Sequence, residues 1–134
     1  MSAASDMNGL WSGEYRYSGN DLSVRFTAAI SECDGRFSGM TLEEAAFDLH
    51  NEPEEYEATI RGDRCGQHVW FTKLYLPSTG ILQPPLIYSG AVDPAFTRVT
   101  GRWVLTRDSQ IDGSFTLSRV STGAMAAVLR ATTA

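Results

Sequence analysis

The sequence contains few of the residues that build disulfide frameworks, metal centres or polar catalytic sites. Its 134 residues include two cysteines, two histidines and one lysine among eleven basic Lys and Arg residues. Two thiols, Cys33 and Cys65, provide no disulfide framework. Cys65 and His68 have ligand-like spacing, but even with Cys33 they do not complete a tetrahedral metal set. We therefore expect no metal site.

Long apolar runs and excess positive charge are also missing. No run approaches the ~18 apolar residues of a membrane span, and the first residues lack the basic and apolar regions of a secretory signal. Sixteen acidic against eleven basic residues give a net charge of −5, which disfavours a nucleic-acid partner. We expect a cytoplasmic protein that binds neither membrane nor nucleic acid.

The motifs of common enzyme classes are absent as well. The chain has no nucleophile elbow, phosphate-binding glycine loop, zinc-protease helix motif or dinucleotide fingerprint. We assign no catalytic residue and no cofactor, and a non-enzymatic role is favoured over catalysis.

What the sequence does contain is apolar and polar alternation with period two, which is typical of half-buried β-strands. Short turn signals such as Asp34-Gly35 interrupt it. The predicted strands cover residues 11–17, 22–30, 37–42, 56–61, 68–76, 86–92, 97–106 and 114–120, with turns that include 62–66 and 107–112. Residues 1–8 are predicted to be a tail, 9–120 the single domain, and 121–134 a second tail or a short helix.

Eight sequential antiparallel strands leave two exposed edges unless the sheet closes on itself. The predicted fold is therefore all-β, an eight-stranded antiparallel up-and-down barrel. Links near residues 34, 65 and 94 are short and share one end, whereas the loops 43–55 and 77–85 lie at the other. This asymmetry predicts a cavity that is open at the end carrying the long loops, large enough for one small ligand.

Gly9-Leu10-Trp11 places a Gly-x-Trp motif on the first predicted strand, and Arg119 lies near the end of the last. The chain thereby resembles the calycin group of lipocalin-like and avidin-like barrels. The resemblance implies that the tryptophan plugs the closed end of the barrel and that Arg119 packs across its indole ring. It does not extend to the biotin-binding residues of the avidin-like proteins.

Aromatic side chains with polar tips are predicted to converge on the open half of the barrel. Strand 68–76 has two possible phases, and we favour the one that points Val69, Phe71, Lys73 and Tyr75 inward. The predicted ligand-binding residues are then Tyr15, Tyr17, Lys73, Tyr75, Tyr88, Trp103 and Phe115.

A lysine inside a barrel needs a carboxylate partner, for which Glu43 and Glu44 are candidates; a lysine on the outer face is the alternative. Apolar residues on both faces of strand 68–76 favour a homo-oligomer, a dimer or a tetramer, in which barrel walls pack together. Coverage of that wall by the C-terminal segment is the other explanation.

The function favoured by these observations is binding of a small apolar or aromatic molecule inside the barrel. Two alternatives stay open. One is an interaction or structural barrel with a filled core, and the other is a cofactor-free isomerase, cyclase or dehydratase.

Overall fold

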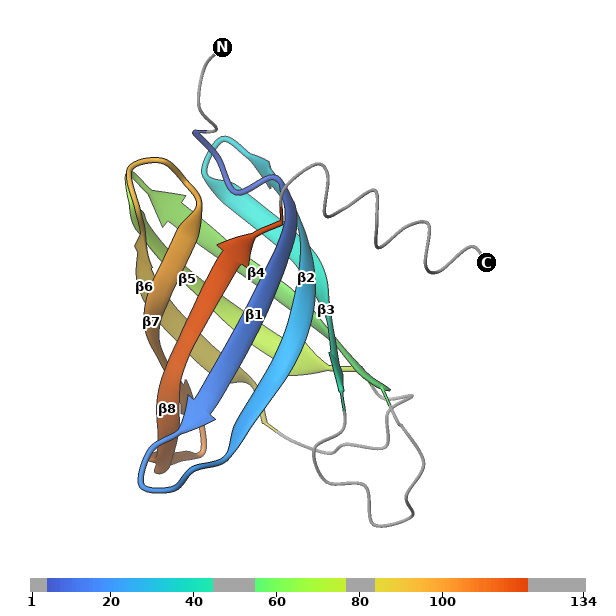
Figure 1. The fold of residues 1–134 in the computed structure, drawn as a ribbon, viewed down its shortest axis with the longest axis vertical. Helices are drawn as coiled ribbons and strands as arrows, with labels where there is room; N and C mark the ends of the chain where they lie inside the picture. The colour runs from blue at the N-terminus through green and yellow to red at the C-terminus, as the bar shows by residue number, and fades with distance from the viewer. Residues whose placement is uncertain (1–4, 45–54, 77–83, 121–134) are drawn as a thin grey trace.

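The computed structural model describes residues 5–44, 55–76 and 84–120, and this part of the chain is built from strands (Figure 1). The strands are β1 (Gly9–Tyr17), β2 (Ser23–Cys33), β3 (Arg36–Glu44), β4 (Glu55–Cys65), β5 (His68–Tyr75), β6 (Leu86–Val92), β7 (Arg98–Leu105) and β8 (Asp108–Arg119). No helix in these ranges is long and apolar enough to cross a membrane.

Each strand pairs antiparallel with the next, and β8 pairs with β1, so the sheet is a closed ring without an edge. This confirms the predicted all-β, eight-stranded up-and-down barrel. The segment 121–134, predicted as a tail or short helix, and most of the two long loops lie outside the described residues.

The link between β2 and β3 has the geometry that its sequence predicts. Asp34 and Gly35 both have positive φ, 53° and 80°. Such a pair matches the two-residue turn that fits the right-handed twist of a hairpin, and glycine and aspartate tolerate it best. The turn brings Cys33 opposite Arg36 and so sets the register of the β2–β3 pair.

Two predicted turns are wrong, because the residues continue strands. Residues 62–65 belong to β4, where Gly62 pairs with Phe71 of β5. A Cβ on Gly62 would lie 2.1 Å from the Trp70 carbonyl oxygen, so this glycine permits close strand approach rather than a turn. Residues 108–112 begin β8 after a two-residue turn, and a register shift at Val104/Leu105 absorbs the irregularity.

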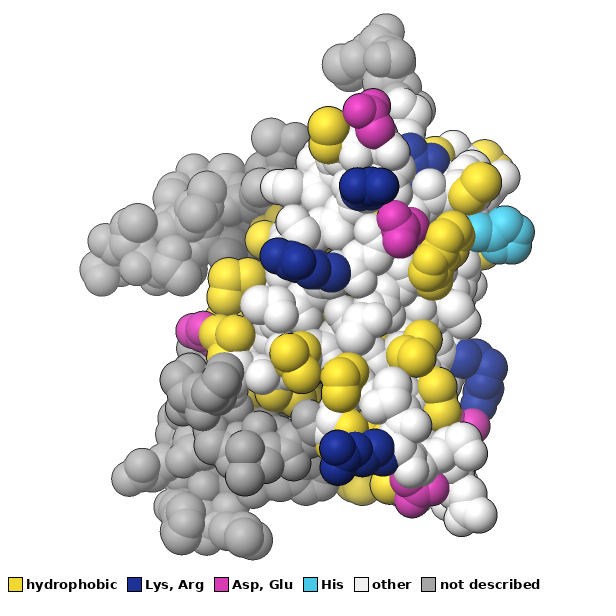
Figure 2. All heavy atoms as spheres, turned by 180° about the vertical axis from the view of Figure 1, so that it is seen from behind, with side chains coloured by type: hydrophobic (Ala, Val, Ile, Leu, Met, Phe, Trp, Pro, Cys, Tyr) yellow, Lys and Arg dark blue, Asp and Glu magenta, His cyan; other side chains and the backbone are white. Residues whose placement is uncertain are grey.

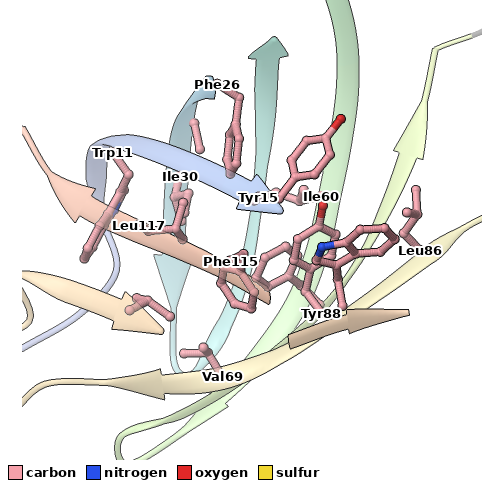
Figure 3. Close-up of a cluster of buried hydrophobic side chains, with 14 of the residues drawn as sticks. Trp11, Tyr15, Phe26, Ile30, Ile60, Val69, Leu86, Tyr88, Phe115 and Leu117 are labelled. Carbon is pink, nitrogen blue, oxygen red and sulfur yellow. The ribbon is translucent and has the colours of Figure 1, made fainter. Parts of the chain in front are cut away.

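The core is the inside of the ring. Alternate residues of every strand point inward and are buried, which is the expected consequence of the period-two pattern. In Figure 3, Trp11 lies at one side of the buried cluster, Tyr15 and Leu86 at the other, and Phe115 between them. We call the two ends of the barrel the Trp11 end and the Glu43 end.

At the Trp11 end, Arg119 stacks over the indole of Trp11, with its guanidinium carbon 4.4 Å from the ring centroid. Arg119 Nε donates to the Phe96 carbonyl at 2.8 Å and Nη2 to the Asp6 carbonyl at 2.6 Å, while Nη1 donates to the carbonyl of Asn8. The Arg119 side chain therefore ties the residues before β1 to the β6–β7 link.

Gly9 and Met7 complete this arrangement. Gly9 has a φ of +132°, and a Cβ there would lie 2.9 Å from Arg119 Nη1, so the first glycine of Gly-x-Trp makes room for the guanidinium. Met7 is buried, and its carbonyl accepts a 2.9 Å hydrogen bond from Trp11 Nε1. The chain before β1 thus covers this end of the barrel.

Replacing Arg119 by alanine is expected to destabilise the barrel by about 3 kcal/mol, because three carbonyl contacts and the indole contact are lost together. Urea unfolding followed by circular dichroism measures the change. The Arg98→Ala variant is the control, since the Arg98 side chain is exposed, and should change stability by less than about 0.5 kcal/mol. Equal effects of the two substitutions would contradict this account of the Trp11 end.

Candidate functional site

A buried polar cluster lies near the Glu43 end of the barrel. Lys73 Nζ is 2.6 Å from Glu43 Oε2, and the two side chains are 2% and 5% exposed. Tyr75 donates its hydroxyl hydrogen to Glu43 Oε1 at 2.5 Å, and Tyr15 donates to the same oxygen at 3.1 Å. The carboxylate therefore accepts three hydrogen bonds and carries the only charge that faces the buried ammonium among the described residues.

Strand alternation brings these side chains together from three strands. On β5 the favoured phase is the observed one, with Val69, Phe71, Lys73 and Tyr75 all buried. On β3 the inward positions near the end of the strand are Thr41 and Glu43. Glu43, one of the two candidate acids, thus contacts Lys73, and Tyr15 reaches it from β1.

Aromatic rings surround the ammonium group. Lys73 Nζ lies 4.7 Å from the ring centroid of Tyr15 and 4.9 Å from that of Tyr75. The rings of Phe26 and Tyr88 are slightly farther away, at 5.5 and 5.9 Å. Cation–π attraction adds to the ion pair at these distances and partly offsets the loss of hydration.

The predicted binding residues form one continuous aromatic wall around this cluster. Trp103 makes edge contacts with Tyr15 and Tyr17, at centroid distances of 5.8 and 5.0 Å. Tyr88 stacks on Trp103 at 6.4 Å and meets Phe115 edge-on at 5.0 Å. The structure therefore brings all seven predicted residues together: Tyr15, Tyr17, Lys73, Tyr75, Tyr88, Trp103 and Phe115.

Burial shifts the ionisation of this cluster. Loss of hydration lowers the pKa of the Lys73 ammonium, and the neighbouring Glu43 carboxylate opposes that shift. Burial, reinforced by nearby negative charge, raises the pKa of Tyr15 and Tyr75 above their usual range, and burial does the same to Tyr88. The tyrosines are therefore hydrogen-bond donors in the folded barrel at neutral pH.

Thr41 adds an unused polar group next to this cluster. Within the residues that the structure describes, its Oγ1 is the one buried side-chain oxygen or nitrogen without a hydrogen-bond partner. Thr41 and Glu43 project from the same face of β3, two residues apart. A buried hydroxyl without a partner costs free energy, so a polar atom supplied from outside the chain would find a favourable partner here.

Thr41 and Phe26 were not predicted from the sequence, and Glu43 was predicted only as one of two candidate partners of Lys73, not as a ligand-binding residue. The alternation of Phe37, Thr41 and Glu43 carries the signal that could have identified two of them, because it places all three on the inner face of β3. The acidic stretch around Glu43 instead suggests a solvated loop. Phe26 is a regular inward position of β2 whose contact with Lys73 depends on barrel closure.

A hollow opens at the surface of the barrel, away from the predicted site. It has a volume of about 520 Å³ and is formed by β2, β3 and β4 near the Trp11 end. Its lining residues are Ser31, Glu32, Cys33, Arg36, Phe37, Ser38, Arg61, Gly62 and Asp63.

Cys33 and Cys65 are both exposed free thiols. In the described ranges, no group of three or more His, Cys, Asp or Glu side chains is placed to hold a metal ion.

Comparison with protein-family models finds no match for this chain, and comparison with curated proteins finds no similar sequence. The site must therefore be interpreted from its own geometry. A neutralised ion pair, phenol donors and a spare hydroxyl within aromatic walls can orient a small molecule by hydrogen bonds.

Removing one member of the ion pair is expected to cost about 3–5 kcal/mol of stability, because the other charge stays buried without its partner. Lys73→Met and Glu43→Leu should each show this loss, and the double variant should recover most of it. Chemical denaturation measures the cycle. As a control, Arg102→Met breaks the exposed Arg102–Asp112 contact of 3.5 Å and should cost less than about 1 kcal/mol. Additive losses in the double variant would contradict the pairing.

Alkaline titration tests the buried phenols. The folded pKa of Tyr15, Tyr75 and Tyr88 is raised, so above about pH 10 the unfolded chain releases protons that the folded barrel retains. Their contribution to stability is complete below pH 10 and is lost as the pH rises further. Near-ultraviolet absorbance should show that these three of the five tyrosines ionise only when circular dichroism reports unfolding.

The Tyr75→Phe variant serves as the control for this titration, because it should reduce the cooperative step by one phenolate. Ionisation of all five tyrosines around pH 10 with the barrel still folded would show that the cluster is open to water.

Proposed function

We propose that the barrel binds a small, partly apolar molecule at the Glu43 end, with the cluster of Tyr15, Glu43, Lys73 and Tyr75 orienting its polar part. The observation that carries the proposal is the buried ion pair itself. A buried pair adds little net stability compared with apolar residues of the same volume, so its presence in an apolar core favours a functional role. Thr41 supports the proposal, since its hydroxyl has an unused hydrogen-bonding capacity beside the pair.

The electrostatics favour a neutral ligand with one hydrogen-bonding group. Lys73 and Glu43 already compensate each other, so an ionic head group would have to break their contact at 2.6 Å. Seven of the sixteen acidic residues lie between residues 43 and 57, which disfavours the approach of an anion. An alcohol, a ketone or an uncharged aromatic ring suits both the aromatic wall and the phenol donors.

Proton transfer is the second candidate function, favoured by the lowered pKa of Lys73. A lysine that loses its proton more easily can serve as a general base if the ion pair with Glu43 opens. The cytoplasmic location expected from the sequence stays a prediction beside both functions.

A thermal-shift screen with neutral alcohols, ketones and aromatic compounds tests the binding function. At a concentration of ~100 times its dissociation constant, a ligand adds about 2.7 kcal/mol, which raises the melting temperature by roughly 10 °C in a domain of this size. The Lys73→Met/Glu43→Leu double variant replaces the ion pair by apolar side chains of similar volume. It should therefore lose most of the rise in melting temperature that the ligand causes. Native mass spectrometry of the purified protein would detect a ligand that is already bound.

The result that contradicts binding is an unchanged melting temperature across the screen together with a protein mass equal to that of the chain alone. That outcome would favour the filled structural barrel. If instead a neutral ketone is bound and its α-proton exchanges with solvent deuterium in the wild type but not in Lys73→Met, proton transfer is the better account.

A further inference from the structure

The outer surface of the barrel carries its exposed large hydrophobic side chains mainly on one wall. Across the described ranges there are seven such residues, and β3, β5 and β6 supply five of them: Met40, Leu42, Trp70, Leu74 and Ile87. Met40 is 48% and Leu74 47% exposed. Figure 2 views the barrel from behind and shows hydrophobic side chains gathered on the face opposite β1 and β8. Exposed large apolar side chains that gather on one face are typical of an interaction site.

The strand register places these residues in ordered rows. Met40 of β3 pairs with Thr59 of β4, and Thr59 pairs with Leu74 of β5, so these three form a central row across the wall. On β4 the same outer face continues with Glu57 on one side of Thr59 and Arg61 on the other. A negative and a positive charge therefore flank the apolar row symmetrically.

We propose that this wall is a dimer interface, in which the outer face of β3, β4 and β5 packs against the same face of a second copy of the chain. The two-fold axis runs along the central row, across the strands. Met40 and Leu74 then pack against their own counterparts. Because this rotation reverses the strand direction, Glu57 of each copy faces Arg61 of the other, so the interface contains two ion pairs.

The positions of Glu57 and Arg61 favour this axis over a two-fold axis that runs parallel to the strands. An axis parallel to the strands would place Glu57 against Glu57 and Arg61 against Arg61, which are repulsive contacts. Within one copy the two side chains cannot satisfy each other, since four residues of extended strand separate their Cα atoms by about 13 Å. In the described part of the chain neither of them forms an ion pair.

The shape of the wall agrees with the same axis. Leu42 lies in the row of Glu57, whereas Ser38 lies in the row of Arg61. The rotation therefore places Leu42 of one copy over Ser38 of the other. Ser38 and Arg61 line the hollow of about 520 Å³, and the small side chain of Ser38 leaves room there for a projecting leucine. An apolar projection, a hollow and a charge pair all repeat under one symmetry operation.

Sedimentation equilibrium on the full chain at micromolar concentrations tests the proposal. The wild type should have twice the 14.7 kDa mass of the chain. Glu57→Arg and Arg61→Glu should each be monomeric, because each places two like-charged pairs in the interface. An equimolar mixture of these two variants should form a heterodimer, and the double reversal Glu57→Arg/Arg61→Glu should restore the homodimer.

Two further variants separate the interface from general effects of surface charge. Leu74→Glu introduces a charge on the central row and should give a monomer. Ile111→Glu introduces the same charge at an exposed apolar residue of β8, four strands away around the ring, and should leave the dimer intact. Recovery of association in the mixture also shows that the single-reversal variants are folded.

A monomeric wild type would overturn the proposal. A wild type that stays associated in both single reversals, or a mixture that stays monomeric, would also overturn this axis. A tetramer that the single reversals halve would support the same interface, whereas a tetramer that they leave intact would overturn it.

Discussion

Closure of the ring between β1 and β8 is the constraint on which the other features of the structure depend. An eight-stranded ring has a narrow interior, just wide enough for the side chains that point into it or for one small ligand. Every inward position is therefore forced into contact with residues from distant strands. Lys73 meets an acid thirty residues away because both positions face the same narrow interior. In an open sheet the same lysine could turn its ammonium group to water.

The two ends of the barrel hold their cations in different ways, since Lys73 is buried and Arg119 is half-buried. Arg119 is held by backbone carbonyls and an indole face, which need no counter-charge and fix the chain before β1. Lys73 is held by the Glu43 carboxylate, which also accepts hydrogen bonds from two phenols, and all of these groups can rearrange or exchange partners. The first arrangement suits a permanent cover, whereas the second suits recognition. This contrast is the physical reason for placing the proposed ligand at the Glu43 end.

The sequence predicts the strands and the closed barrel well because period-two alternation and short links leave few other topologies. It predicts the inward phase of β5 correctly, since that phase groups Lys73 and Tyr75 with other polar-tipped residues. The sequence-based prediction fails where the same residue types occur in turns and in strands. Gly62 is typical of a turn, yet it lies within β4 because the neighbouring backbone passes too close for a side chain. Residues 108–112 are mostly polar, as in a loop, yet they belong to β8, where Asp108 and Asp112 pair with β7.

The polar cluster was only partly predictable for a similar reason. Glu43 belongs to an acidic stretch, and its burial follows from its register on β3 rather than from its own chemistry. The same register makes β3 and β5 two-sided, with Glu43 and Lys73 inside and Met40 and Leu74 outside. Strand alternation therefore couples the inner and outer surfaces, since a one-residue slip would expose the ion pair and bury the outer apolar row in the core. The exposed pair would also lose its phenol donors, so the ion pair and the outer wall favour the same register.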